Sequence, residues 1–485
     1  MSLSPLGAIA AGSATGAAPL VPCICEPGAP LAIVIQMQLK RSESGSLDRH
    51  ECGFSVAPDV QLDSVEFSSC PRKTMSQIHE YTNSFARNAL RSRASAPGLR
   101  ITAAKMLFPG QTYSTEQVRD LLMPTIEATS RRLQRAGAAA LEPTFGSHFL
   151  ARLGVHTRSL AVDPSAPHLW WQRERSTDPI ARVGAACFRA LMAERQPLSE
   201  GDKVIAVSNA YDTTCPNLVT HILNDLQRDA PGFNYPEQLS LLGDGCSGFI
   251  SALREANTHL RAFPESRVVI VADELTSQHF YNPELLETLT QRAENAGSAQ
   301  ERKAWANVVR GLFIQRFLFG DGVVAVMCES DRMADDGLRL NTFRRWTNLD
   351  PDDIDIFGIR GMGTKGESTA PYGYFFQDPK RLFARLQEAY IPAMAKGLAE
   401  ASCTPDAFAV HTGSGPILEQ VFHGLQIPSA LHGPSVSVLR DHGNMNTASG
   451  AAITAELLNG AGRVPANPFL AFFGVGFTAQ VAYYE

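Results

Sequence analysis

The chain has 485 residues, enough to bury a large core and to form two or three structural units of ordinary domain size. Hydrophobic residues make up 44% of it and charged residues 19%, proportions that exclude a disordered or fibrous protein. Its 43 Lys and Arg residues against 49 Asp and Glu residues give a formal charge of -6, which argues against nucleic acid or an anionic membrane as a partner.

Residues 1–95 show no clear periodicity, and we interpret them as an N-terminal extension. The stretch 1–30 is rich in Ala, Gly, Ser and Pro, and the first basic residue is Lys40, so we expect no secretory signal. The apolar run 31–39 is far shorter than the roughly 20 residues of a membrane span. Nine scattered cysteines, an odd number, predict free thiols and a cytoplasmic location.

Four of these cysteines lie in the extension and leave one alternative open. Cys23 and Cys25, with Cys52 and Cys70, could form a zinc site, but the usual closely spaced pairs with two to four intervening residues are missing. We therefore expect isolated thiols there, and no bound metal.

From residue 101 onward, short apolar runs alternate with amphipathic segments. Four apolar runs predict buried strands, at 203–207, 267–272, 323–327 and 408–411. Residues 246–260 carry apolar side chains at three- or four-residue spacing, which predicts a helix. The charged segment 283–316 lies between two of these runs as though inserted, and its pattern predicts a solvated helix pair. Strands that alternate with helices indicate an α/β layered fold.

Cys246 stands in the sequence GDGCSG, immediately before the predicted helix. Glycines on both sides let the backbone turn sharply and let a substrate approach the sulfur. The N-terminus of the helix favours the thiolate form of a cysteine. This setting predicts a nucleophile, although a buried structural cysteine is the alternative.

Two further polar residues lie near the end of the chain. His411 follows the strand residues 408–410 and opens a turn rich in Gly and Pro, a place where active-site residues of α/β folds often lie. Asn444 comes just before a helix predicted at 451–458, and an ordinary helix cap is its alternative role. We rank His432 and His442 below His411, because neither follows a strand.

Together these segments resemble the ketoacyl synthase III and type III polyketide synthase branch of the thiolase superfamily. GDGCSGFISAL resembles the nucleophile motif of ketoacyl synthase III, and FGDGVVAVM resembles a strand of the family. HTGSGPILEQV is similar to a segment of plant-type polyketide synthases, RDHGNMNTAS to the family's asparagine segment, and FFGVGFTAQVAYY to its terminal glycine-rich hairpin. The five motifs occur in the family's order over about residues 100–485.

The resemblance implies a five-layered αβαβα thiolase fold, built from two duplicated βαβαβαββ halves and usually found as a homodimer. The first half would be residues 96–335, with the insertion at about 283–316, and the second half residues 336–485. The resemblance explains neither the extension nor the insertion.

Carried over to this sequence, the resemblance makes Cys246 the acceptor of an acyl group. His411 and Asn444 would donate hydrogen bonds to the thioester carbonyl of a second substrate, where an enolate forms. Backbone N–H groups of Cys246 and Val475 would form an oxyanion hole, each worth about 3 kcal/mol.

Other positions match the family less closely. Gly474 and Gly476 flank Val475 where the synthase III pattern has three glycines, and we expect this loop to border the acyl pocket. Asn446 occupies a place that is commonly Ser. Arg158 resembles an arginine near the pantetheine entrance, which predicts contact with substrate.

These residues predict an acyltransferase that forms a carbon–carbon bond by decarboxylative Claisen condensation of a Cys-bound acyl group with a malonyl-type thioester. The product would belong to fatty acid or polyketide biosynthesis, including secondary metabolism. Thioesters of coenzyme A or acyl carrier protein would be the substrates, with no bound cofactor. Two alternatives stay open: acyl transfer to an alcohol or amine, and a non-decarboxylative condensation whose general base the sequence does not locate.

Overall fold

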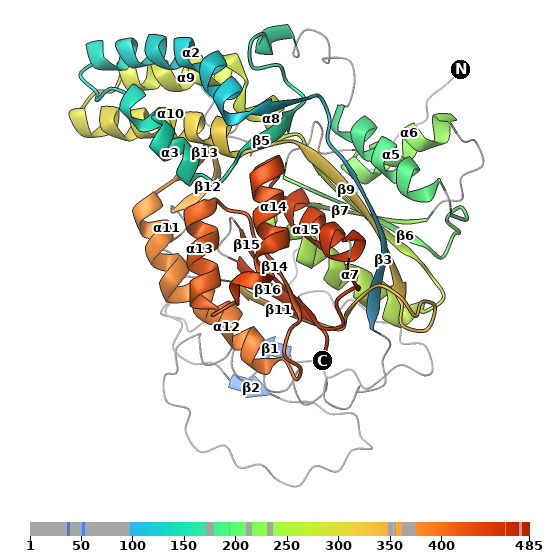
Figure 1. The fold of residues 1–485 in the computed structure, drawn as a ribbon. Helices are drawn as coiled ribbons and strands as arrows, with labels where there is room; N and C mark the ends of the chain where they lie inside the picture. Colours follow the sequence, from blue (N-terminus) through green and yellow to red (C-terminus); the bar gives the residue numbers. More distant parts are fainter. Residues whose placement is uncertain are drawn as a thin grey trace, which may run out of the picture. The chain divides into compact units, whose positions relative to one another are not determined.

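The computed structural model describes residues 36–38, 51–53, 98–169, 179–193, 195–209, 216–229, 236–347, 353, 356–360, 374–460, 462–474 and 478–485 (Figure 1). The chain divides into two compact units, Met1–Ser92 and Arg93–Glu485. In the first unit, β1 (Gln36–Gln38) pairs antiparallel with β2 (Glu51–Gly53). Cys23, Cys25 and Cys70 of the zinc alternative lie outside the described residues.

The first sheet of the second unit has six strands in the order β10-β3-β9-β8-β6-β7. These strands are β3 (Leu99–Leu107), β6 (Lys203–Ser208), β7 (Glu237–Leu242), β8 (Val268–Glu274), β9 (Gly322–Ser330) and β10 (Leu338–Leu340). β6 pairs in parallel with β7 and β8, whereas β9 is antiparallel to β8 and β3. The runs predicted as strands at 203–207, 267–272 and 323–327 form β6, β8 and β9.

The side chains of β8 show why these runs are continuously apolar. Val268, Ile270 and Ala272 belong to one core cluster, and Val269 and Val271 belong to another on the opposite face of the sheet. Successive side chains of a strand point to opposite faces, so a strand that is covered on both sides needs apolar residues at every position.

The second sheet has four described strands in the order β11-β16-β15-β14. They are β11 (Thr342–Thr347), β14 (Ala407–Val410), β15 (Pro468–Gly474) and β16 (Thr478–Tyr483). β14 and β15 are parallel, and β15 and β16 form the antiparallel terminal hairpin that the sequence predicts. Only Asn341 separates β10 from β11, so the chain passes from one sheet to the other there.

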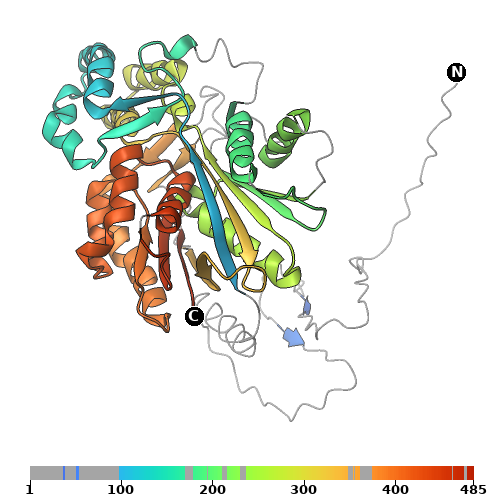
Figure 2. The same ribbon diagram turned by 45° about the vertical axis from the view of Figure 1, so that its right-hand side comes forward.

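Helices lie between the two sheets and on the outer face of each. They are α5 (Pro179–Met192), α6 (Leu218–Asp229), α7 (Gly248–Ala262), α12 (Ile391–Glu400), α13 (Gly415–Gly424), α14 (Gly433–His442) and α15 (Thr447–Asn459). α7 contacts β6, β8, β15 and β16, and α15 contacts β3, β9 and β14, which places both between the sheets. Figure 1 shows α12 and α13 on one outer side and α5 and α6 on the other, and Figure 2 agrees. The predicted five-layered αβαβα fold is therefore confirmed.

The predicted insertion packs into a separate helical region at one end of the sheets (Figure 2). The helices of this region are α2 (Thr115–Arg135), α3 (Ser147–Arg152), α9 (Pro283–Glu294) and α10 (Ala299–Leu318). The insertion itself forms α9 and α10. The prediction of a helix pair is confirmed, but its description as solvated is only half right. Leu289, Phe313 and Phe317 are fully buried in a cluster shared with α2, because α2 covers the inner face of the pair.

The remaining elements connect these layers. They are β4 (Gln111–Ser114), η1 (Glu142–Phe145), β5 (Thr157–Leu160), α8 (Thr276–Phe280), β12 (Phe357–Arg360), β13 (Tyr374–Gln377), α11 (Pro379–Arg385), η4 (Leu386–Tyr390) and η5 (Ser429–Leu431). Among the described helices, none combines the length and the apolar character that crossing a bilayer requires.

Candidate active site

Cys246 lies in a single 3₁₀ turn, η2 (Gly245–Ser247), between β7 and α7. Gly243 and Gly245 have φ angles of 77° and 61°, a region that glycine adopts without strain. The helix predicted to start at Cys246 starts at Gly248, so the thiol lies in the turn before it. The cysteine keeps part of its surface exposed, as a residue that meets substrate requires.

Contacts from several elements fix this turn. The backbone N–H of Gly245 donates to Asn209 Oδ1 at 2.8 Å, and its carbonyl accepts from Thr447 Oγ1 at 3.0 Å. Gly474, which ends β15, lies so close that a Cβ added to it would come within 2.7 Å of the Cys246 backbone nitrogen. Cys246 therefore lies where the central helix layer meets the second sheet.

Two features of the structure act against the thiolate form that a position before a helix favours at Cys246. Burial raises the pKa of its thiol, and the nearby carboxyl of Glu274 raises it further. Both effects oppose the N-terminus of α7, whose influence falls off within a turn. In this structure the surroundings of Cys246 therefore raise the pKa of its thiol.

Glu274 is a candidate general base that sequence reasoning missed. It ends β8 and is fully buried, and its Oε1 accepts from the backbone N–H and the Nδ2 of Asn209, both at 2.9 Å. Its Oε2 has no hydrogen-bond partner among the described residues. Burial raises its pKa to about 7. The available signal was an acidic residue at the carboxyl end of an apolar strand, where active sites of α/β sheets form.

His411 follows β14, as predicted, and its backbone N–H donates to the carbonyl of Ala471 at 3.1 Å. The imidazole packs edge-on against Phe473, with ring centroids 4.8 Å apart. Phe473 directly precedes Gly474, so His411 packs against the end of β15 that adjoins the turn of Cys246. Burial lowers the pKa of His411 to about 3, which keeps the ring neutral.

Asn444 lies in the connection between α14 and α15. Its backbone N–H donates to Leu318 at 2.9 Å and its carbonyl accepts from Gly320 at 3.1 Å, so the connection is held to the entry of β9. Its side-chain Oδ1 accepts from the backbone N–H of Asn446 at 2.8 Å. The alternative of an ordinary helix cap is wrong, because Asn446 is the residue that precedes α15.

Asn446 makes the direct contact with the nucleophile. The Cys246 thiol donates to its Oδ1 at 2.9 Å. Asn446 has φ 52° and ψ -124°, a backbone conformation that costs a non-glycine residue about 1–3 kcal/mol. The sequence comparison marked Asn446 only as a departure from Ser and gave it no role.

The other predicted site residues have different outcomes. Val475 and Gly476 lie outside the described residues, so the oxyanion hole at Val475 and the substrate contact of Gly476 stay predictions. Arg158 lies in β5 with no exposed surface, and its Nη2 donates to Thr115 Oγ1 at 2.5 Å. Burial lowers its pKa to about 10. The predicted substrate contact finds no support here, because the guanidinium is fully enclosed.

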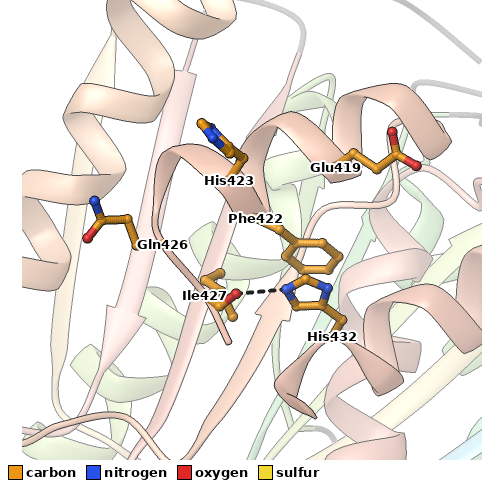
Figure 3. A pocket seen from close by; sticks show the side chains of 6 residues that line it. All are labelled: Glu419, Phe422, His423, Gln426, Ile427 and His432. Carbon is orange, nitrogen blue, oxygen red and sulfur yellow. Dashed lines mark hydrogen bonds between the residues drawn. The ribbon is translucent and has the colours of Figure 1, made fainter. Parts of the chain in front are cut away.

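A surface pocket of about 530 Å³ lies at the end of α13, away from the cysteine. His432 lines it but stacks on Phe422 and bonds to the carbonyl of Ile427 at 2.9 Å. Figure 3 shows Glu419 and His423 pointing away from each other, so the pocket gathers no reactive group.

Among the described residues, no cluster of three or more His, Cys, Asp or Glu could hold a metal ion.

Comparison with known proteins shows that this chain is similar to polyketide synthases, although no family model matches it. The chain is 28% identical over 379 residues to a 1,3,6,8-tetrahydroxynaphthalene synthase of Streptomyces griseus, which covers 77% of this chain and 85% of that protein. PKS-I of the brown alga Ectocarpus siliculosus has a TM-score of 0.58 at 14% identity, over 81% of this chain and 99% of that one.

A third comparison is with the 1,3,6,8-tetrahydroxynaphthalene synthase of Streptomyces coelicolor A3(2), described as a bacterial type III polyketide synthase. Its TM-score is 0.56 at 20% identity, over 79% of this chain and 98% of that one. The chain therefore has the fold that the sequence motifs predict.

Proposed function

We propose, from the premise that the chain is a condensing enzyme of the thiolase superfamily related to type III polyketide synthases, that it extends an acyl group on Cys246 by decarboxylative Claisen condensation. The observation that carries the proposal is the bond of 2.9 Å between the Cys246 thiol and the 444–446 connection. It joins the predicted nucleophile to the segment that contains the predicted asparagine.

The first step is acyl transfer. The Cys246 sulfur attacks the carbonyl of an acyl thioester, the S–H proton passes to a base, and the departing thiolate takes up a proton. The Nδ1 of His411 has no partner among the described residues, so it can take this proton and pass it to the departing thiolate, and the pKa of about 3 ensures that the ring does not keep the proton. Backbone N–H groups at the turn would stabilise the tetrahedral oxyanion.

The second step creates the carbon nucleophile. Loss of carbon dioxide from a malonyl-type thioester leaves the bonding electrons as an enolate, with negative charge on the thioester oxygen. The Asn444 side chain accepts through Oδ1 from Asn446 and Ser449, which fixes the amide and leaves Nδ2 to donate to that oxygen. Neutral His411 would be the second donor, and the enolate carbon then attacks the Cys246 thioester.

The substrates that we propose are thioesters of coenzyme A. Thioesters of acyl carrier protein are the alternative substrates. No cofactor enters either step, because loss of carbon dioxide leaves the electron pair of the broken bond on the α-carbon as the enolate. A homodimer in the cytoplasm, acting in polyketide biosynthesis, is the setting we propose for this chemistry.

Glu274 supports a second candidate function, non-decarboxylative condensation. That reaction needs a base that removes an α-proton, and a carboxyl with a pKa raised to about 7 is matched to this work at neutral pH. Asn209 links Glu274 to the turn that carries Cys246, because its Nδ2 donates to Glu274 and its Oδ1 accepts from the backbone N–H of Gly245. Decarboxylation is favoured, because Glu274 is already held by Asn209 and Thr447.

Release of labelled carbon dioxide from carboxyl-labelled malonyl-CoA distinguishes the two reactions. We expect release that rises when an acyl-CoA is added, and its loss in His411→Ala. A matched control is His423→Ala, which changes an exposed histidine of the α13 pocket. Product formed from two acyl-CoA molecules without any carbon dioxide, and abolished in Glu274→Gln, would favour the second candidate instead.

A further inference from the structure

A chain of buried polar side chains lies next to the turn that carries Cys246. Its members come from the turn, from α7 and from β16, and each has at most 2% of its surface exposed: Ser247, Ser251, Thr478 and Gln480. Burying polar groups costs free energy unless hydrogen bonds satisfy them. The bonds of this chain therefore show which part of the site it holds in place.

Ser247, the residue after Cys246, is bonded from three sides. Its Oγ donates to the carbonyl of Asp244 at 3.1 Å, bonds to Thr478 Oγ1 at 2.9 Å, and accepts from Gln480 Nε2 at 3.1 Å. A hydroxyl donates one proton and accepts twice, so all three places are filled when Thr478 is the donor. The Ser247 carbonyl also accepts from Gln480 Nε2, at 3.2 Å.

The second contact of Gln480 runs through α7 to the start of the turn. Its Nε2 donates to Ser251 Oγ at 2.9 Å, and Ser251 Oγ donates to the carboxylate of Asp244, which is closer to it than Gln480 Oε1 at 3.3 Å. Arg345 of β11 donates to both oxygens of that carboxylate, each at 3.2 Å. Because this chain ends at a charged acceptor, Gln480 is the donor at its other end.

The turn needs this support because of the role proposed for its backbone. The backbone N–H of Cys246 is the proposed oxyanion donor, and such a donor has to lie about 2.7–3.1 Å from the developing oxygen. A displacement of about 1 Å can cost about 10²-fold in rate. Gly474 of β15 also approaches the turn, since a Cβ there would come within 2.7 Å and 3.1 Å of the backbone nitrogens of Cys246 and Ser247. β15 therefore supports the turn by close packing, and β16 by hydrogen bonds.

We propose that Gln480 is a positioning residue for acyl transfer, which holds the turn through Ser247 and Ser251 so that the backbone N–H of Cys246 meets the oxygen of the acyl carbonyl. This inference rests on the proposed function of Cys246 as the acyl acceptor. Loss of the Gln480 donor slows attack on a carbonyl, where an oxyanion forms. It spares reactions of the same thiol that form no oxyanion.

Two reagents separate these reactions, p-nitrophenyl acetate and iodoacetamide. With the ester, the Cys246 sulfur attacks the carbonyl through an oxyanion, the S–H proton goes to solvent and nitrophenolate leaves. Iodoacetamide loses iodide from a saturated carbon and forms no oxyanion. Gln480→Met keeps about the same volume and removes the donor, so acetylation of Cys246 should become at least about tenfold slower, with alkylation within about twofold of the wild type. The mass of the Cys246 peptide over time gives both rates.

Ser251→Ala is a milder variant that also serves if Gln480→Met fails to fold. It removes the middle of the chain and leaves the bonds between Gln480 and Ser247, so acetylation should slow about threefold or more, with alkylation unchanged. Ser130→Ala is the matched control, because Ser130 of α2 is also fully buried and hydrogen-bonded, but in the helical region. Both of its rates should equal those of the wild type.

Gln480→Glu adds a pH profile that a residue with only a structural role would not give. A protonated carboxyl can donate to the turn as the amide does, whereas an ionised carboxyl places negative charge against the Ser247 carbonyl and the Asp244 carboxylate. The acetylation rate of this variant, divided by that of the wild type at the same pH, should therefore fall several-fold between pH 5 and pH 8.

Acetylation of folded Gln480→Met at the wild-type rate, or equal slowing of acetylation and alkylation, would overturn the proposal. A flat ratio for Gln480→Glu, or slowing of the same size in Ser130→Ala, would also contradict it. A protein that shows all the expected rates but forms no product with malonyl-CoA would count against the proposed condensation alone. A folded wild-type protein that is not acetylated on Cys246 would remove both proposals.

Discussion

Carboxyl groups have opposite surroundings in the helical region and at the nucleophile. In the helical region, Arg132 donates to Glu287 at 2.6 Å and to Glu294 at 2.7 Å, and these bonds lower the pKa of both carboxyls. Beside Cys246, Glu274 is buried among neutral donors and its pKa is raised to about 7. The helical region pairs its charges, whereas the candidate active site keeps a carboxyl that no cation among the described residues contacts.

The largest effects should come from the neutral donors near Cys246. His411→Ala or Asn444→Ala should reduce malonyl-CoA decarboxylation about 10²–10³-fold, because each removes a donor from the developing enolate. The rate of carbon dioxide release under saturating malonyl-CoA measures this loss of decarboxylation activity. If either variant kept more than a third of the wild-type rate, with His423→Ala behaving as wild type, that residue would have no part in enolate stabilisation.

Close packing at the turn should give the next largest effect. Gly474→Ala would place a Cβ within 2.7 Å of the Cys246 backbone nitrogen, so we expect acyl transfer to Cys246 to slow more than about tenfold. Gly433→Ala is the matched control, since a Cβ there meets nothing within 4 Å. Equal rates of acyl adduct formation in the two variants would show that β15 does not support the nucleophile.

Glu274→Gln should change stability with a specific pH dependence. A carboxyl whose pKa is higher in the folded state costs folding free energy once pH exceeds its unfolded value, by about 1.4 kcal/mol per unit up to about 7. The glutamine variant should therefore match the wild type at pH 4 and exceed it above pH 7. Urea unfolding at both pH values measures the difference in the free energy of unfolding. An equal gain in stability at both pH values would show that titration of Glu274 is not its cause.

The smallest effect should be that of the Arg132 pair. Arg132→Ala should lower the free energy of unfolding by only about 0.5–1 kcal/mol, because the ion pairs are partly exposed and screened by salt. The loss should shrink as pH falls through the lowered pKa values of Glu287 and Glu294 and these carboxyls protonate. Carbon dioxide release should not change, and a loss of activity without a loss of stability would contradict the separation of the two regions.

The elements that the sequence predicted correctly were those with one dominant local signal. The apolar runs at 203–207 and 267–272 became β6 and β8, because strands buried on both faces must be apolar throughout. The position of His411 directly after a strand was also predicted correctly, because β14 ends at Val410. The inner face of α9 and α10 was missed, because only packing against α2 shows which side of the charged helices is buried.

The groups that act on the Cys246 thiol could not be predicted from the order of residues in the sequence. The sequence places Cys246 before a helix and so favours a thiolate, but Glu274 comes from a different strand and Asn446 from the far end of the chain. Their effect on the sulfur depends on contacts across the sheets. A departure from the family pattern at Asn446 was the one available hint.

The most direct test of the account is the mass of the intact protein after incubation with a panel of acyl-CoA thioesters, followed by malonyl-CoA. The account predicts an acyl adduct on the peptide containing Cys246 that is lost or extended when malonyl-CoA is added, and no adduct in Cys246→Ala. Cys403→Ala, which removes an exposed cysteine, should behave as the wild type. An adduct that persists in Cys246→Ala, or none on any thioester in the folded wild-type protein, would contradict it.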